Sequence, residues 1–82
     1  MSNTPSWLAR ERAEVDKLDQ KIAKLLLRRF RRTQKIQRLK KQRKLAPIDL
    51  VREAEILQRL EGAAKKPKQK KFIKKIFKTI LK

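Results

Sequence analysis

The chain has 82 residues, and its 26 Lys and Arg against 8 Asp and Glu give a formal net charge of +18, with no His. The absence of Cys and His excludes disulfides, Cys-ligated zinc, a thiol nucleophile and the commonest general base. A single Gly leaves no Gly-rich phosphate-binding loop. A chain this short buries little surface, so we expect one domain over residues 1–82 that gains stability from a partner subunit.

The remaining composition, rich in Leu, Ile, Ala, Lys, Arg, Gln and Glu, predicts an all-α protein. The first twelve residues do not show a basic end followed by an apolar run, so we expect no secretory signal. The apolar runs are far shorter than the ~20 residues that span a bilayer. These observations together predict a cytoplasmic protein.

The first expected helix covers residues 6–42, where no Gly or Pro interrupts the chain and Ser6 is a candidate N-cap. Its apolar residues recur at spacings of three, four and seven: Leu8, Val15, Leu18, Ile22, Leu25, Leu26, Ile36 and Leu39. At 1.5 Å per residue such a helix is ~50 Å long. A monomer of this size cannot cover that apolar stripe, so we expect the subunits to pack together as an intertwined homodimer.

Two shorter helices are expected after Pro47. Asp49 is placed to cap a helix over residues 49–62, which should end near Gly62. A polar connection at residues 65–68 leads to a third helix over residues 69–81. The apolar face of this third helix comprises Phe72, Ile73, Ile76, Phe77, Ile80 and Leu81. The predicted order is therefore one long helix followed by two short ones.

Three cations interrupt the apolar stripe of the first helix. Arg29 lies seven residues from both Ile22 and Ile36, Arg12 lies between Leu8 and Val15, and Lys40 follows Arg29 by close to three turns. A buried cation without a partner costs several kcal/mol. Each side chain therefore pairs with an acid of a neighbouring helix, reaches water, or binds an anionic ligand. Because 26 cations share only 8 acids, a small dianion is the sharper hypothesis.

A second polar cluster, Asp49, Arg52 and Glu53, lies within one turn at the start of the second expected helix. It has two interpretations. Asp49 is a helix cap with Arg52 in solvent, or all three side chains point at one ligand.

The combination of these segments resembles the all-helical chorismate mutases. The resemblance covers about residues 7–61 and rests on LARER at 8–12, VDKLD at 15–19, LLLRR at 25–29, Lys40, and PIDLVREAEIL at 47–57. Each segment is common, but their order and spacing together are fairly specific. The resemblance implies a dimer of three-helix chains with two active sites, each built from both subunits.

The resemblance also implies an activity, the rearrangement of chorismate to prephenate on the route to Phe and Tyr, without metal or cofactor. By position, Arg12 would grip a substrate carboxylate in the partner's site, and Arg29 would hold a carboxylate in its own. Lys40 would donate to the ether oxygen of the breaking bond. The catalytic residues would be Lys40, Arg29 and Glu53. The remaining substrate-binding residues would be Arg52, beside a carboxylate, and Asp49, which would face the ring hydroxyl together with Glu53.

The family's third helix normally continues to a further polar pair that includes a second donor to the ether oxygen. This sequence reaches Lys82 before those positions, and its nearby polar residues are Lys78, Thr79 and Lys82. An isochorismate-pyruvate lyase on the same fold is the nearest alternative, and the cluster at residues 49–53 favours the mutase.

The other alternative is a non-enzymatic protein that binds a polyanion. Residues 28–44 hold ten cations and residues 65–82 hold nine lysines, with no acid in either segment. Nucleic acid or an anionic membrane is therefore a possible partner, although base-stacking residues are sparse, with Phe30 the only aromatic in the first segment.

Overall fold

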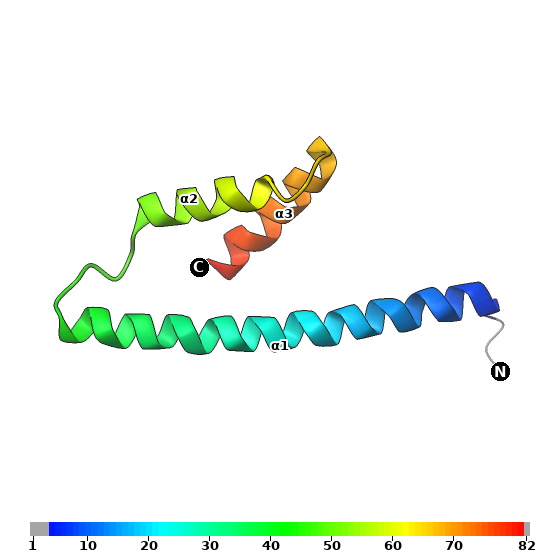
Figure 1. The fold of residues 1–82 in the computed structure, drawn as a ribbon, viewed down its shortest axis with the longest axis horizontal. Coiled ribbons are helices and arrows are strands. Elements are labelled where there is room, and N and C mark those ends of the chain that lie inside the picture. The colour runs from blue at the N-terminus through cyan, green and yellow to red at the C-terminus, as the bar shows by residue number, and fades with distance from the viewer. Residues whose placement is uncertain (1–3, 82) are drawn as a thin grey trace. The chain divides into compact units, whose positions relative to one another are not determined.

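The computed structural model describes residues 4–81, which contain three helices and no strand. Helix α1 spans Ser6–Gln42, α2 spans Leu50–Glu61 and α3 spans Pro67–Ile80 (Figure 1). The all-α class, with one long and two short helices, is confirmed. The chain divides into two units, one ending at Leu45 and the other beginning at Ala46. The single domain over residues 1–82 and the intertwined dimer stay predictions.

Helix α1 begins without a side-chain cap. Its N-cap residue is Pro5, with φ −58° and ψ 148°, and the carbonyl of Pro5 accepts from the N–H groups of Leu8 and Ala9, each at 3.1 Å. The prediction that Ser6 is the N-cap is therefore wrong. Pro5 itself is outside the helix because its ψ is 148°, and its carbonyl accepts the first helical hydrogen bonds, so Ser6 is already the first residue of the helix.

The C-terminus of α1 is closed by a Schellman motif, in which two turn N–H groups return to the last helical carbonyls. The N–H of Leu45 donates to the carbonyl of Lys40 at 2.8 Å, and the N–H of Lys44 donates to that of Lys41 at 3.3 Å. Lys44 has φ 56°, the left-handed conformation that usually calls for Gly. The motif therefore fixes the backbone of the turn that carries Lys40.

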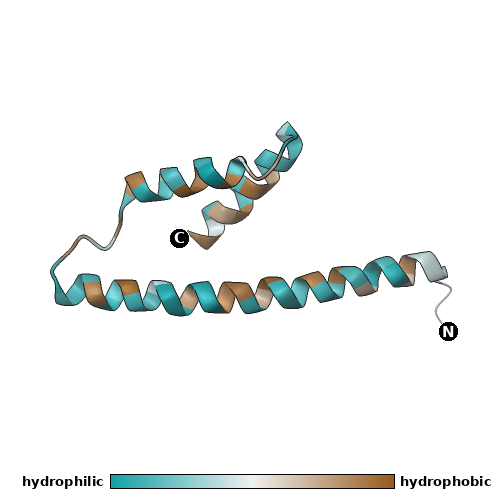
Figure 2. Cartoon of the chain, viewed as in Figure 1, coloured by the Kyte–Doolittle hydropathy of each residue, from teal (hydrophilic) through white to brown (hydrophobic). Residues whose placement is uncertain are grey.

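The apolar stripe of α1 faces solvent. No side chain among residues 4–81 is buried, and Ile22 and Leu25 are 53% and 59% exposed. Apolar residues recur along the whole helix (Figure 2). A stripe of this length that stays uncovered in one chain is typical of a protein interface.

In the second unit, α2 begins at a capped turn, as the sequence predicted. The carboxylate of Asp49 accepts the N–H of Arg52 at 3.0 Å, which satisfies one of the free donors of the first turn. At the other end the helix stops at Glu61, and Gly62 has φ −64°. The backbone of Gly62 therefore has the right-handed helical conformation, which any residue can adopt. The helix does not end here because of a left-handed conformation that only Gly would favour.

Helix α3 begins two residues earlier than expected, at Pro67, because proline is well suited to the first helical position. The side-chain oxygen of Gln69 accepts the N–H of Lys66 at 3.4 Å, which supports this start.

Helices α2 and α3 pack against each other within their unit. An ion pair joins Lys74 Nζ to Glu61 Oε1 at 3.7 Å. Phe72 stays 62% exposed, so the apolar face of α3 is only partly used. The partly buried apolar residues of the two helices are Ile56, Leu57, Leu60, Ile73, Phe77 and Ile80. Within residues 4–81, no helix combines the length and the hydropathy that crossing a membrane requires.

Candidate active site

Arg29 and Lys40 lie on the same side of α1. Eleven residues separate them, which places them ~16 Å apart along the helix axis and only about 20° apart around it. Both side chains are partly buried, whereas their neighbours Arg28 and Lys41 are exposed. Neither cation has a carboxylate partner among residues 4–81. The unit thus presents two cations without ion pairs on one helix face.

Arg12 lies far from both of these cations on the same rigid element. Helix α1 runs without a break from Arg12 to Arg29, so the 17 residues between them correspond to ~26 Å of helix. Arg12 is exposed and points about 100° away from Arg29 around the axis. The two arginines of one chain therefore cannot grip the same compact molecule.

Thr33 lies on the same face between Arg29 and Lys40, and the sequence analysis did not single it out. It is partly buried, and its hydroxyl donates to the carbonyl of Phe30 at 2.9 Å. Its position four residues after Arg29 and seven before Lys40 is the signal that could have identified it. A site on this face of α1 would be lined by Thr33.

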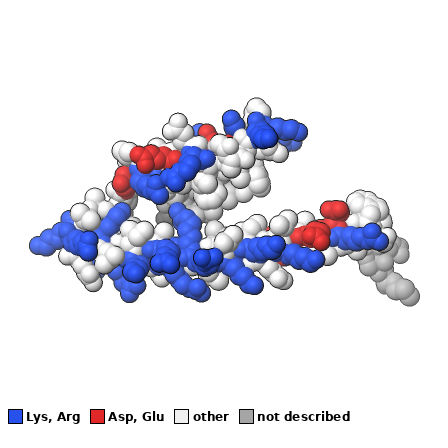
Figure 3. All heavy atoms as spheres, viewed as in Figure 1, with Lys and Arg blue, Asp and Glu red and all other residues white. Residues whose placement is uncertain are grey.

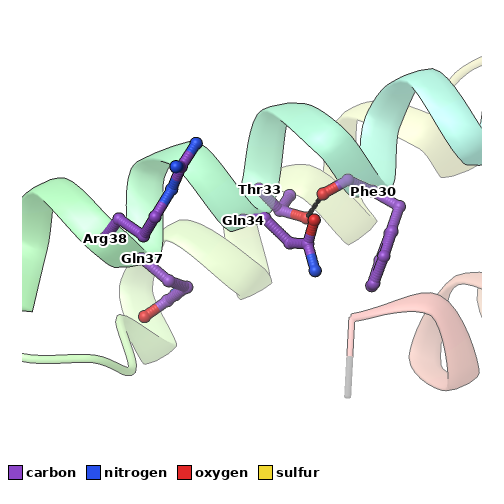
Figure 4. A pocket seen from close by; sticks show the side chains of 5 residues that line it. All are labelled: Phe30, Thr33, Gln34, Gln37 and Arg38. Atoms are coloured by element: carbon purple, nitrogen blue, oxygen red, sulfur yellow. Dashed lines mark hydrogen bonds between the residues drawn. The ribbon is translucent and has the colours of Figure 1, made fainter.

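Side chains of α1 also form two shallow concavities. One is lined by Phe30, Thr33, Gln34, Gln37 and Arg38, and Figure 4 shows the Thr33 hydroxyl turned towards the backbone of Phe30. The other is lined by Arg28, Arg31, Arg32, Lys35 and Arg38. Neither is lined by Arg29 or Lys40. Neither concavity of the first unit therefore encloses Arg29 and Lys40.

The cluster at the start of α2 adopts the capping arrangement. One oxygen of Asp49 is occupied by the N–H of Arg52, while the guanidinium of Arg52 lies 4.0 Å from the carboxylate of Glu55. Arg52 and Glu55 side chains are 54% and 60% exposed, so this pair is worth little, and Arg52 is free to leave it. Glu53 is partly buried and has no ion pair among residues 4–81.

The polar residues near the end of α3 do not supply a clear extra donor. The hydroxyl of Thr79 donates to the carbonyl of Lys75 at 3.5 Å, so it is directed at its own helix. Lys78 is exposed, and Lys82 lies outside the described residues. No role is assigned to any of the three.

The predicted site residues are thus divided between the two units. Arg12, Arg29 and Lys40 belong to α1, whereas Asp49, Arg52 and Glu53 belong to the first turn of α2. Their assembly into one site stays a prediction. Within residues 4–81 no group of three or more Asp or Glu could hold a metal ion. Guanidinium and ammonium groups bind carboxylates and stabilise an oxygen that gains negative charge, which is the chemistry that this set of residues offers.

Comparison with known proteins identifies one family. The sequence model described as chorismate mutase type II matches residues 11–82, which include all six predicted site residues. Searches of curated proteins and of solved structures gave no match.

Proposed function

Because the chain belongs to the chorismate mutase type II family, we propose that it converts chorismate to prephenate, on the route to Phe and Tyr. The observation that carries the proposal is the pair Arg29 and Lys40, two cations on one face of α1 without carboxylate partners among residues 4–81. They lie within the matched residues, where a dicarboxylate substrate would supply the missing negative charge.

The reaction suits a site without His, Cys or a cofactor. The rearrangement is unimolecular: one carbon–oxygen bond breaks as one carbon–carbon bond forms, and no proton is transferred. Catalysis then has two parts. The enzyme holds the flexible substrate with its reacting carbons close together, and it places positive charge where the ether oxygen becomes negative.

In this proposal the cations of α1 divide these two tasks. Arg29 binds one substrate carboxylate through its two-pronged guanidinium. Lys40 donates to the ether oxygen, and the Schellman motif at the end of α1 supports its position. Arg12 binds the other carboxylate from a second protomer, because ~26 Å of helix keeps it from the site of its own chain.

The first turn of α2 completes the proposed site. Arg52 supports carboxylate binding, for which it gives up only a weak, exposed contact with Glu55. Glu53 and the second oxygen of Asp49 face the ring hydroxyl. The first oxygen of Asp49 keeps its bond to the N–H of Arg52, which holds the turn in place.

The proposed assembly is a homodimer. The apolar stripe of α1 is long and exposed, and a second copy of the chain would cover it. The same contact would bring Arg12 of one protomer to Arg29 and Lys40 of the other.

Turnover of chorismate by the purified protein tests the proposal, with paired variants at neighbouring positions. Arg29→Ala and Lys40→Ala should each lower kcat/KM by about 10²–10³-fold, the usual effect of losing one charge-stabilising donor. Arg28→Ala and Lys41→Ala remove the same kinds of side chain from exposed neighbouring positions and should change kcat/KM less than about 3-fold. Absence of chorismate turnover by a well-folded wild-type protein would refute the proposal that the chain is an enzyme.

Product analysis separates the mutase from its nearest alternative. We expect prephenate from chorismate and no pyruvate from isochorismate. Release of pyruvate from isochorismate, without prephenate from chorismate, would instead identify an isochorismate-pyruvate lyase on the same fold.

A further inference from the structure

Helix α1 carries a second charged feature outside the proposed site. Six cations recur at spacings of three and four residues along one side of the helix, and we name them the basic stripe: Lys24, Arg28, Arg31, Arg32, Lys35 and Arg38. At about 100° per residue they fall within about 120° of the helix circumference and cover ~21 Å of its length. Figure 3 shows Lys and Arg side chains following α1, with acidic ones near its beginning.

The basic stripe points away from the proposed active site. Its centre lies about 130° around the helix from the row that contains Ile22, Arg29, Ile36 and Lys40. A partner that covers the apolar row therefore leaves the stripe in solvent. The two sets of cations can act independently of each other.

The stripe is not neutralised within the chain. None of its six cations has a carboxylate partner among residues 4–81, and the sequence contains no acid between Asp19 and Asp49. Five of the six line one shallow concavity. Exposed like charges this close together repel one another, so binding of a polyanion relieves the repulsion.

The arrangement favours one kind of polyanion. No apolar residue lies inside the stripe, so a membrane would meet charge alone, and inserting the apolar row would turn the cations away from the headgroups. Phe30, the one aromatic residue of this segment, shares a concavity with Arg38 at the edge of the stripe but lies about 130° around the helix from the stripe's centre. A single aromatic side chain at one edge gives a run of single-stranded bases little on which to stack. Double-stranded nucleic acid requires neither feature, because a straight row of arginines can follow its phosphates.

We propose that the basic stripe of α1 binds the phosphate backbone of double-stranded nucleic acid, without base specificity and independently of the active site. Four of the six residues are Arg, which suits two-pronged contact with phosphate oxygens. If all six contact phosphates, the affinity falls with salt with a logarithmic slope of about −5, from 0.9 per contact.

Two variants of equal net charge test whether the basic stripe is the binding site. The stripe variant replaces Arg28, Arg31, Arg32, Lys35 and Arg38 with Gln. The matched control replaces five exposed lysines of α3 with Gln, at Lys68, Lys70, Lys71, Lys75 and Lys78. Both lower the net charge by five, from +18 to +13. Fluorescence anisotropy measures binding to labelled duplex DNA between about 50 and 200 mM salt, and circular dichroism measures helix content.

We expect the stripe variant to lose about 100-fold or more in affinity, with a slope near −1, while the control keeps a slope near −5. An equal loss of DNA affinity in both variants would refute the location of the binding site on the basic stripe. It would show that the affinity depends only on the net charge of the chain. Tighter binding to the separated strands, or to phosphatidylserine vesicles in cosedimentation, would refute the choice of partner. The salt dependence of wild-type binding and the comparisons with separated strands and with vesicles use only the wild-type protein. These measurements therefore test the proposal even if a variant misfolds.

Discussion

The proposal that two protomers share each active site makes a quantitative prediction about mixed dimers. Arg12 and Arg29 lie ~26 Å apart along one rigid helix, so a site that uses both must take them from different protomers. Arg12→Ala and Arg29→Ala should each alone lower turnover by about 100-fold or more, to a level negligible beside the wild type. When the two inactive variants are unfolded together and refolded at equal amounts, half of the dimers are mixed. One of the two sites in each mixed dimer has both arginines, so about one quarter of the wild-type activity should return.

The matched control is a chain that carries both substitutions, mixed with wild-type protein in equal amounts. Each site of a mixed dimer now lacks one arginine, so activity should again be about one quarter of an all-wild-type sample. A site contained in one chain predicts different values, none for the first mixture and about half for the second. Initial rates of chorismate loss measure both mixtures. No recovery in the first mixture, with half the activity in the second, would refute the reasoning.

Three further predictions concern stability and association. Lys44→Gly should raise the free energy of unfolding in urea by about 1 kcal/mol, because Gly accepts a φ of 56° without the cost of a side chain; a loss of stability would contradict the Schellman motif. Asp49→Ala should lower the free energy of unfolding by about 1 kcal/mol, and Asp49→Asn should lower it by much less, because Asn also caps helices. Equal losses in the two variants would contradict the capping role. In sedimentation equilibrium we expect the wild type to be the proposed dimer and Ile22→Asp to be a monomer, because a carboxylate would be buried in the interface; a dimer of the variant would place the contact elsewhere.

The helices could be predicted because their signals are local. A 37-residue segment without Gly or Pro, with apolar residues at helical spacing, leaves few alternatives to a long helix. Asp49 was identified as a cap for the same reason, since its bond is to a residue three positions away. The errors are local as well: Pro5 rather than Ser6 precedes α1, and Pro67 opens α3 instead of belonging to the connection.

The candidate site could be predicted only in part. The spacing of Arg29 and Lys40 indicates a shared face, and the helix places them on one. Spacing along a helix carries no information about what faces it, so the relation of these cations to Asp49, Arg52 and Glu53 stays a prediction. The expected role of Arg12 comes from the family resemblance. Helix length adds only that Arg12 and Arg29 of one chain, ~26 Å apart, cannot hold the same small molecule.

The uncovered row of Leu and Ile on α1 also bears on how the protein is made. In the proposed dimer only a second copy covers these side chains, so a newly made chain is open to chaperones and proteases until that copy arrives. The yield of finished protein should therefore rise more steeply than in proportion to the rate of synthesis, as for any bimolecular step.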